Sequence, residues 1–354
     1  MNLSVSRLKV TALRAKFTLL LFSISYLCLP TTVMAENAHD RGIGLYLDQD
    51  LFAFGLNEDR DYTTGVAMEF FWQKEGIYPL DKAVLWFGNK FGILDENTKT
   101  ERSFLIGNIA FTPDNLSASA PIQNDRPYAS LIYLANKHVY ADHDAAIGIV
   151  MQAGILGTSI SREVQQVLHR QWRNATDDTE PVDPKGWGHQ ISNGGELTFG
   201  LGVAYSKLLA ESDNRTWDIA ATSNINVGYE THAGLGLSAR VGNIASPFWT
   251  LPYNPIRRGN FLPSLAGEEW YLWAAYRARV IGYNALLQGQ FRDSDVEFDG
   301  DELRRLVHDA GVGLTLTYKP AQVTFSVNAK SAELDVGAAD RLHVWGGMYV
   351  TFRF

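Results

Sequence analysis

The chain has 354 residues and a formal net charge of −8 at pH 7. This negative balance argues against nucleic acid as a partner, because binding phosphates needs a net basic face. The only cysteine, Cys28, lies near the N-terminus, so the rest of the chain forms no disulfide and no thiolate metal site.

The first 35 residues have the pattern of a signal peptide. The first sixteen residues contain four basic residues and no acidic one, and an apolar run of about thirteen residues, "FTLLLFSISYLCL", follows them. After this run, "TVMA" offers a cleavage site. An uncleaved anchor is the alternative, but the run is shorter than the roughly 20 residues of a spanning helix. We predict a signal peptide over 1–35 and one mature domain over 36–354. The mature formal charge is then (31 − 4) − 39 = −12.

Beyond residue 35, apolar and polar residues alternate with period two. "VTFSVNAKS" and "ELTFGLGVAY" show the pattern, and each such segment is long enough to cross a bilayer as a tilted strand. Aromatic residues cluster near the segment ends, as in "EFFWQ" and "EEWYLWAAY". The last segment, "HVWGGMYVTFRF", ends on Phe354, which is typical of bacterial outer-membrane proteins. We predict a membrane barrel; a periplasmic two-sheet sandwich is the alternative.

The predicted fold is all-β, a 12-stranded antiparallel transmembrane β-barrel with a short helix in an extracellular loop. The predicted strands are 42–50, 64–73, 102–111, 129–139, 144–156, 195–205, 217–229, 234–243, 269–280, 307–318, 321–331 and 343–354. We interpret 283–291 as an extended loop arm, because single-chain bacterial barrels have even strand numbers. Twelve strands enclose a narrow interior, which we expect side chains to fill.

If the chain starts in the periplasm, every other connection faces outward. The first, 51–63, lies in a stretch rich in acids, which are Asp48, Asp50, Glu58, Asp59 and Asp61. The third, 157–194, contains "SISREVQQVLHRQWRN". We predict a helix there with Ser161 as N-cap and an apolar stripe formed by Ile160, Val164, Val167, Leu168 and Trp172. His169 follows Gln165 by four residues, which places both on one helix face.

Five motifs, taken in order, resemble the lipid A 3′-O-deacylase family of outer-membrane barrels. They are "DQDLF" at 48–52, "DRDYTTG" at 59–65, "FTPDN" with "NDRPYAS" at 111–130, "EVQQVLHR" at 163–170 and "PKGW" at 184–187. All five lie in the first half of the mature chain, and its second half matches as barrel strands without specific motifs.

The resemblance implies a calcium-dependent ester hydrolase of lipid A in the bacterial outer membrane, with its site facing the outer leaflet and exterior. It assigns Asp50 to the metal and His169 to catalysis as general base, with Gln49, Thr63 and Gln165 as further site residues. Gln49 stands where the family usually has asparagine. Carboxylate and carbonyl oxygens suit Ca²⁺, which would polarise the ester, and an imidazole can accept a proton at neutral pH. The expected partners are lipopolysaccharide and outer-membrane lipids, and we expect a monomer.

Some members carry an active-site lysine in the second outward loop, but 112–125 contains no basic residue. We therefore consider Arg126 and Lys185 as substrate-binding cations. "DRPY" also fits a structural role, with Asp125 and Arg126 paired at a strand start.

Other functions remain open on the sequence. A serine hydrolase would use Ser159, Ser161 or Ser192, but none lies in a nucleophile motif, so we favour an activated water. "DSDVEFDGDEL" at 293–303 lacks the oxygen spacing of an EF-hand; solvated acids or calcium bridges to lipopolysaccharide phosphates are the two interpretations. The non-enzymatic alternative is a structural barrel or small channel with ion-binding loops.

Overall fold

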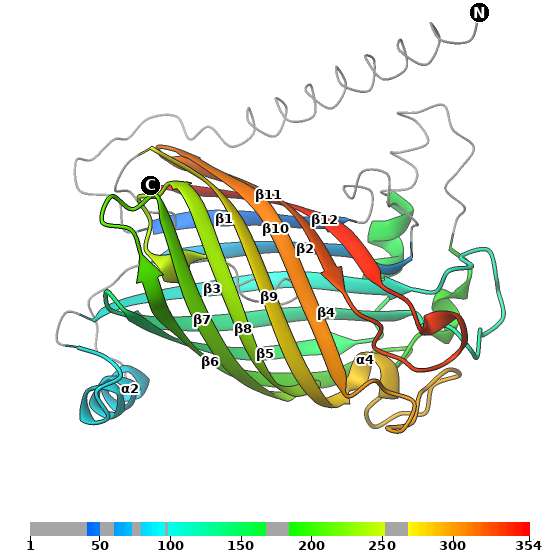
Figure 1. Cartoon of the computed structure of the whole chain (residues 1–354). Helices are drawn as coiled ribbons and strands as arrows, with labels where there is room; N and C mark the ends of the chain where they lie inside the picture. Colours follow the sequence, from blue (N-terminus) through cyan, green and yellow to red (C-terminus); the bar gives the residue numbers. More distant parts are fainter. Residues whose placement is uncertain (1–40, 50–59, 73–78, 96–97, 168–183, 252–267) are drawn as a thin grey trace, which may run out of the picture.

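The computed structural model describes residues 41–49, 60–72, 79–95, 98–167, 184–251 and 268–354, and the predicted signal peptide lies outside them. In this described part, twelve antiparallel strands form one closed barrel in chain order, with β1 paired to β12 (Figure 1). The strands are β1 (Arg41–Gln49), β2 (Asp61–Trp72), β3 (Lys99–Thr112), β4 (Ala129–Ala141), β5 (Ala145–Leu156), β6 (Glu196–Glu211), β7 (Trp217–Gly228), β8 (Glu230–Asn243), β9 (Glu269–Asn284), β10 (Leu306–Tyr318), β11 (Ala321–Lys330) and β12 (His343–Arg353).

The twelve predicted strands are confirmed, and 283–291 adds no thirteenth strand to the wall, as predicted. The segment is not an extended arm, however. Tyr283 and Asn284 complete β9, and α4 (Ala285–Gln288) follows at once. The Asn284 side chain accepts a hydrogen bond from the Leu286 amide and so caps this helical turn. Leu286 and Leu287 are buried, so the apolar residues of this segment serve the core of the connection.

The wall exposes apolar side chains and buries polar ones. In β9, Leu272 and Val280 are more than half exposed, whereas Arg277 and Arg279 are buried inside the barrel. Alternating side chains of a strand point to opposite faces, so the outer face is apolar and the inner face polar. This is the arrangement of a transmembrane barrel and the reverse of a soluble sandwich, which the closed sheet also excludes.

Side chains fill the interior, as predicted. Asp309 accepts hydrogen bonds from both Arg277, at 2.6 Å, and Arg279, at 2.7 Å, and Arg279 also pairs with Glu230. These four charged groups are all buried and come from β8, β9 and β10. Their charges are paired across the interior, as buried charges need to be.

The barrel has two rims that differ in structure. The first described residue, Arg41, meets the C-terminus at one rim, where its amide donates to the Phe354 carbonyl; we call this the proximal rim, and α2 (Pro79–Lys90) lies there (Figure 1). The opposite, distal rim carries the connections after β1, β3, β5, β7, β9 and β11. These include α4, a helical segment at 160–167, η2 (Gly186–His189) and η4 (Gly337–Ala339). The remaining short helix, η3 (Phe248–Thr250), follows β8 at the proximal rim. None of the helices in the described part is long and apolar enough to cross a membrane.

Candidate functional site

The outer face of the wall changes from apolar to polar near the distal rim. In β3, Phe104 and Ile106 point outward and are exposed, and Asn108 and Thr112 follow on the same face but are buried. In β2, the exposed Val66 is preceded on its face by the buried Thr64. These polar residues therefore lie at positions where the alternation predicts a lipid-facing side chain. Because they are buried, another part of the protein must cover them.

Two hydrogen bonds join the polar residues across strands. The Thr64 hydroxyl donates to Oε1 of Gln49 at 3.0 Å, and Thr63 and Thr112 share a hydrogen bond of 2.6 Å between their hydroxyls. The pairing of β2 with β3 shifts between Asp61 and Thr64. This shift is a β-bulge, in which β2 has one residue more than the segment of β3 that it faces. A bulge changes the direction of nearby side chains, and here the Thr63 side chain contacts Thr112. Gln49 and Thr63, both predicted site residues, are thus buried in this patch.

The helical segment 160–167 contributes the cover. The Ser161 hydroxyl donates to Oδ1 of Asn108 at 2.7 Å, so the helix attaches to the outer face of β3. Ser161 and Gln165, one turn apart, are its buried residues, while Ile160 and Val167 are exposed. The face turned to the wall is therefore polar, because the wall it meets is polar here.

Two predictions for this helix are wrong. The helix begins at Ile160, and the Glu163 amide bonds to the Ser159 carbonyl, so Ser161 lies inside the first turn and is not the N-cap. Of the predicted apolar stripe, Ile160 and Val167 point to the surroundings and not onto the rim. Leu168 and Trp172 lie outside the described residues.

Trp187 fixes Gln165 from a separate part of the connection. Its indole N–H donates to Oε1 of Gln165 at 2.9 Å, and its ring packs on Tyr128 with 4.9 Å between centroids. Nε2 of Gln165 and Nδ2 of Asn108 are buried and have no acceptor among the described residues. An unmade buried hydrogen bond costs about 1–3 kcal/mol, so two such donors between helix and wall suggest a place for a ligand.

Asp50 and His169 lie outside the described residues, and their predicted roles stay predictions. By sequence, Asp50 directly follows Gln49, and His169 follows Gln165 by four residues. Gln49 and Gln165 belong, with Thr63, Thr64, Asn108, Thr112 and Ser161, to the buried polar patch described above, which we call the wall patch.

Comparison with known families identifies the chain's relatives. The family described as outer membrane protein LpxR matches residues 19–354. The chain belongs to the LpxR family of outer-membrane proteins. Among solved structures, LpxR from Salmonella typhimurium matches with a TM-score of 0.63 and 17% identity, covering 88% of this chain and 100% of that one. No curated protein matches.

Other outer-membrane barrels align less closely than the LpxR structure. The β domain of the Bordetella autotransporter BrkA gives a TM-score of 0.43 at 8% identity, covering 90% of this chain and 100% of that one. The translocator domain of NalP from Neisseria meningitidis gives 0.39 at 9% identity, covering 89% and 87%. The LpxR family assignment and the barrel together place the protein in the outer membrane.

The two candidate cations of this LpxR family member occupy different environments. Arg126 is 2% exposed, donates to Glu333 at 2.6 Å and lies 4.0 Å over the Phe111 ring. Lys185 is exposed, and its backbone amide donates to the Leu116 carbonyl at 3.0 Å. Lys185 therefore lies beside 112–125, the stretch that contains no basic residue.

A buried charge cluster around Glu333 holds the distal rim together on its inner side. Glu333 pairs with Arg126 and also with Lys330, at 3.1 Å. Burial alone would raise the pKa of Glu333, but the charges of Lys330 and Arg126 outweigh it and hold that pKa well below its usual value of 4.5. The carboxylate is consequently ionised at neutral pH and fixes two cations.

Arg341 links three connections of the same rim. Its guanidinium donates to Asp61 at 2.7 and 2.8 Å and to Asp125 at 2.6 Å. The predicted ion pair between Asp125 and Arg126 is therefore wrong, because Arg341 is the cation bound to Asp125. Arg126 donates to the Asp125 carboxylate through its backbone amide, at 2.7 Å.

The acids of the first outward stretch do not form one solvated group. Asp48 points inward and accepts hydrogen bonds from Tyr62 at 3.1 Å and Tyr349 at 2.9 Å. Asp61 is bound to Arg341, and Glu58 and Asp59 lie outside the described residues. Within the described ranges, no group of three or more His, Cys, Asp or Glu side chains is placed to hold a metal. The oxygens of the wall patch are instead those of hydroxyl and amide groups, and amide carbonyl oxygens are among the ligands that Ca²⁺ takes.

The serine candidates and the 293–303 segment also find partners. The hydroxyl of Ser161 bonds to Asn108, and that of Ser192 donates to Glu196 at 2.5 Å. Asp295 contacts His189 at 2.5 Å, which joins the fifth outward connection to the third. Val296 and Phe298 are buried in the core of that connection, so the segment is folded structure and not a free acidic loop.

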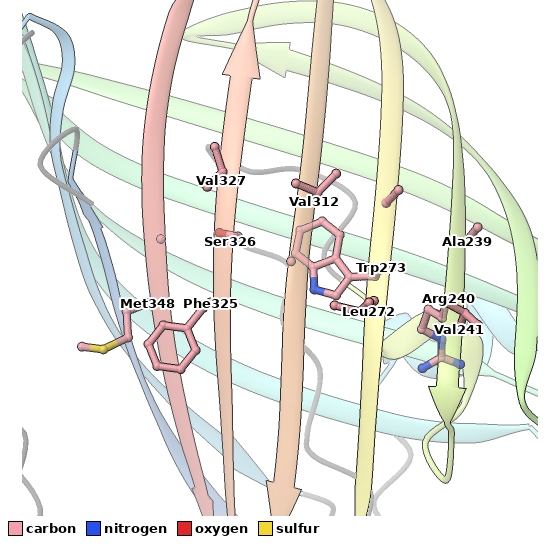
Figure 2. A pocket seen from close by; sticks show the side chains of 13 residues that line it. Ala239, Arg240, Val241, Leu272, Trp273, Val312, Phe325, Ser326, Val327 and Met348 are labelled. Carbon is pink, nitrogen blue, oxygen red and sulfur yellow. The ribbon is translucent and has the colours of Figure 1, made fainter. Parts of the chain in front are cut away.

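The outer wall also carries a hollow away from the distal rim. It has a volume of about 650 Å³ and lies across β8 to β12 (Figure 2). Leu272, Val312 and Phe325 line it with other, mostly apolar, groups. Its position on the lipid-facing wall, away from the distal rim, separates it from the wall patch.

Proposed function

We propose that this LpxR family member is a calcium-dependent lipid A 3′-O-deacylase that hydrolyses an ester-linked acyl chain of lipopolysaccharide. The observation that carries the proposal is the wall patch itself. It is a buried polar site on the lipid-facing side of the barrel, beneath a helix and beside exposed apolar residues such as Val66 and Ile106.

The position matches the chemistry of the substrate. In lipid A the acyl esters lie at the boundary between hydrocarbon and sugar headgroup. The wall patch lies at the same kind of boundary, where the apolar wall ends. In our proposal the distal rim faces the exterior, so that the site opens toward the outer leaflet, which holds the lipopolysaccharide.

The residues of the chain divide the work as follows in this proposal. His169 takes a proton from a water molecule, whose oxygen attacks the ester carbonyl carbon. The bond to the leaving oxygen then breaks, a fatty acid forms, and His169 returns its proton to the leaving oxygen. Gln165, held by Trp187, orients the imidazole, and the free amide donor of Asn108 bonds to an oxygen of the substrate.

Asp50, Gln49 and Thr63 are the residues that would hold calcium. A bound Ca²⁺ supplies charge that polarises the ester carbonyl. Gln49 already accepts a hydrogen bond from Thr64, so its carbonyl oxygen is fixed in place within the patch. Lys185 supplies the positive charge that 112–125 lacks and binds an anionic group of the headgroup.

The test is a deacylation assay on the purified, folded protein. Lipid A is incubated with the protein and Ca²⁺ and the product is analysed by mass spectrometry. We expect the loss of one acyl chain, abolished by EDTA and by either His169→Ala or Asp50→Ala. Asp340→Asn, at an exposed site in the last outward connection, is the matched control and should retain activity. Unchanged lipid A with folded wild type in the presence of Ca²⁺ would refute the proposal and favour a structural barrel.

A further inference from the structure

Helix α2 at the proximal rim has two apolar faces, although only one of them packs on the protein. The face formed by Asp81, Val84, Leu85 and Gly88 is buried or half-buried. The other face carries Trp86 and Phe87, and Phe91 continues it beyond the last turn. A helix that is apolar on both sides is normally covered on both sides.

The inner face fixes α2 to the barrel. Asp81 is buried and forms a salt bridge with Arg102 of β3, and it accepts a hydrogen bond from Tyr140 of β4 at 2.8 Å. Leu94, also buried, packs against Gly88, where a Cβ would lie 2.7 Å from the leucine side chain. The helix is therefore held at a defined place on the wall, with its orientation set.

The outer face presents aromatic rings to the surroundings. Trp86, Phe87 and Phe91 are 61%, 51% and 59% exposed. The rings of Phe87 and Phe91 lie 4.4 Å apart between centroids, and the ammonium of Lys90 lies 4.6 Å over the Trp86 ring. Three neighbouring exposed aromatics form an apolar patch of the kind that marks a protein or membrane contact.

We propose that α2 is an interfacial helix that binds phospholipid in the membrane leaflet at the proximal rim. Three observations select lipid as the occupant. Tryptophan and phenylalanine are suited to the boundary of headgroup and hydrocarbon. Lys82 and Lys90 are exposed beside the rings and can meet lipid phosphates.

The third observation is continuity with the lipid-facing wall. α2 connects β2 to β3, and the outward residues Phe70 and Phe104 of these strands are paired in register and exposed near the proximal rim. The aromatic face of α2 extends this membrane-facing surface. The inference rests on the outer-membrane location and not on the proposed deacylation; in the orientation proposed above, the leaflet is the periplasmic one.

Spin labelling tests the inference in reconstituted protein. The chain has a single cysteine, so Cys28→Ser gives a cysteine-free background for Phe87→Cys and Phe91→Cys. Asn89→Cys, on the exposed flank of α2, is the aqueous control, and Leu237→Cys, on the outer wall of β8, is the lipid control. Each variant is labelled with a nitroxide in phospholipid vesicles, after its heat-dependent gel mobility has shown a folded barrel.

We expect labels at 87 and 91 to collide more with oxygen, which concentrates in lipid, than with a water-soluble nickel chelate, as at 237. The label at 89 should show the opposite preference. Labels at 87 and 91 that favour the nickel chelate would place the aromatic face in water. Labels shielded from both reagents would place a protein partner there. Either result overturns the inference.

Discussion

Trp187 fixes Gln165 from outside the helix that carries it. The glutamine is buried, its carbonyl oxygen is bound by the indole, and its amide nitrogen is left without an acceptor in the described part of the chain. A side chain held at one end with a free donor at the other is pre-organised for a ligand or a neighbouring group. In the proposed enzyme, Oε1 of Gln165 also accepts a hydrogen bond from the ring N–H of His169, which leaves the other ring nitrogen free to act as the base. The free amide donor then bonds to an oxygen of the substrate.

Trp187→Phe should lower kcat about tenfold, since the lost hydrogen bond is worth about 1–3 kcal/mol and each 1.4 kcal/mol is a factor of ten in rate. The phenylalanine ring retains contact with Tyr128, so the barrel should still fold, with a free energy of unfolding lowered by no more than about the same 1–3 kcal/mol. Deacylation rates measured from pH 5 to 9 are the readout. A positioning role also shifts the acidic limb of the profile, whereas a structural role leaves its shape unchanged. Trp217→Phe, at the start of β7 at the proximal rim, is the control.

Lys185→Ala should raise KM about fivefold and leave kcat unchanged, because an exposed ion pair contributes up to about 1 kcal/mol. Lys185→Arg keeps the charge and should restore binding. Steady-state assays on lipid A and on dephosphorylated lipid A show whether the effect of Lys185 on KM depends on the phosphate groups of the substrate. If the variant and the wild type differ equally on both substrates, Lys185 does not bind phosphate.

Glu333→Gln should destabilise the barrel by about 3–5 kcal/mol at pH 7, because Arg126 and Lys330 lose their buried counter-charge. The folded pKa of Glu333 lies below the usual 4.5, so its ionised form contributes full stability above that value. The contribution falls as pH drops through the lower folded pKa. We therefore expect urea unfolding in lipid vesicles to show a constant difference in the free energy of unfolding between the wild type and Glu333→Gln from pH 7 to about 5. In stronger acid this difference should become smaller.

The exposed pair of Asp340 with Arg304 supplies the comparison for Glu333, and Asp340→Asn should leave the unfolding midpoint unchanged. A Glu333→Gln protein as stable as the wild type at pH 7 would contradict the interpretation of the buried cluster.

Among the elements, ion pairs tie the connections of the distal rim to one another. Arg341 joins the start of β2 to the connection before β4 from within the connection before β12. The wall patch depends on this rim, because Thr63 follows Asp61 by two residues.

Arg341→Ala should loosen these connections without opening the barrel. We expect limited proteolysis to cleave 113–128 several-fold faster, while the heat-dependent gel shift of the folded barrel is retained. The expected cause is that two buried carboxylates, those of Asp61 and Asp125, lose the guanidinium that joins them. Arg304→Ala, which removes an exposed pair, should leave the cleavage rate unchanged.

The elements also show how far sequence reasoning reaches. The strands follow from local alternation, so β11 and β12 could be predicted to within a residue or two. Asn108 carries a readable signal, since it is polar on the outward phase of β3. Its cover, Ser161, comes 53 residues later, and Arg341 lies 280 residues from Asp61. Such distant contacts leave no periodic trace, and for the same reason the buried role of Asp48 was not predictable.

The whole molecule is a barrel whose interior is occupied by paired charges. The interior contains the buried, paired charges of Asp309, Arg277, Arg279 and Glu230. Tyr46 of β1 and Trp345 of β12 are buried as well. Such an interior leaves little room for solutes to pass.

The protein reconstituted in planar bilayers should consequently show no stepwise conductance in concentrated KCl. The double variant Arg277→Ala and Arg279→Ala, which empties part of the interior, serves as the matched comparison and should leak ions. Regular channel openings by the wild type would favour the small-channel alternative over the enzyme.

The wall patch faces sideways, out of the barrel, and not along its axis. For an enzyme of this geometry the substrate arrives by diffusion within the membrane plane and need not leave it. Turnover would then depend on the mole fraction of lipid A in the surrounding leaflet, and diluting the vesicles at fixed composition would leave the rate per protein unchanged. The membrane thus acts as the reaction medium for this site as well as its support.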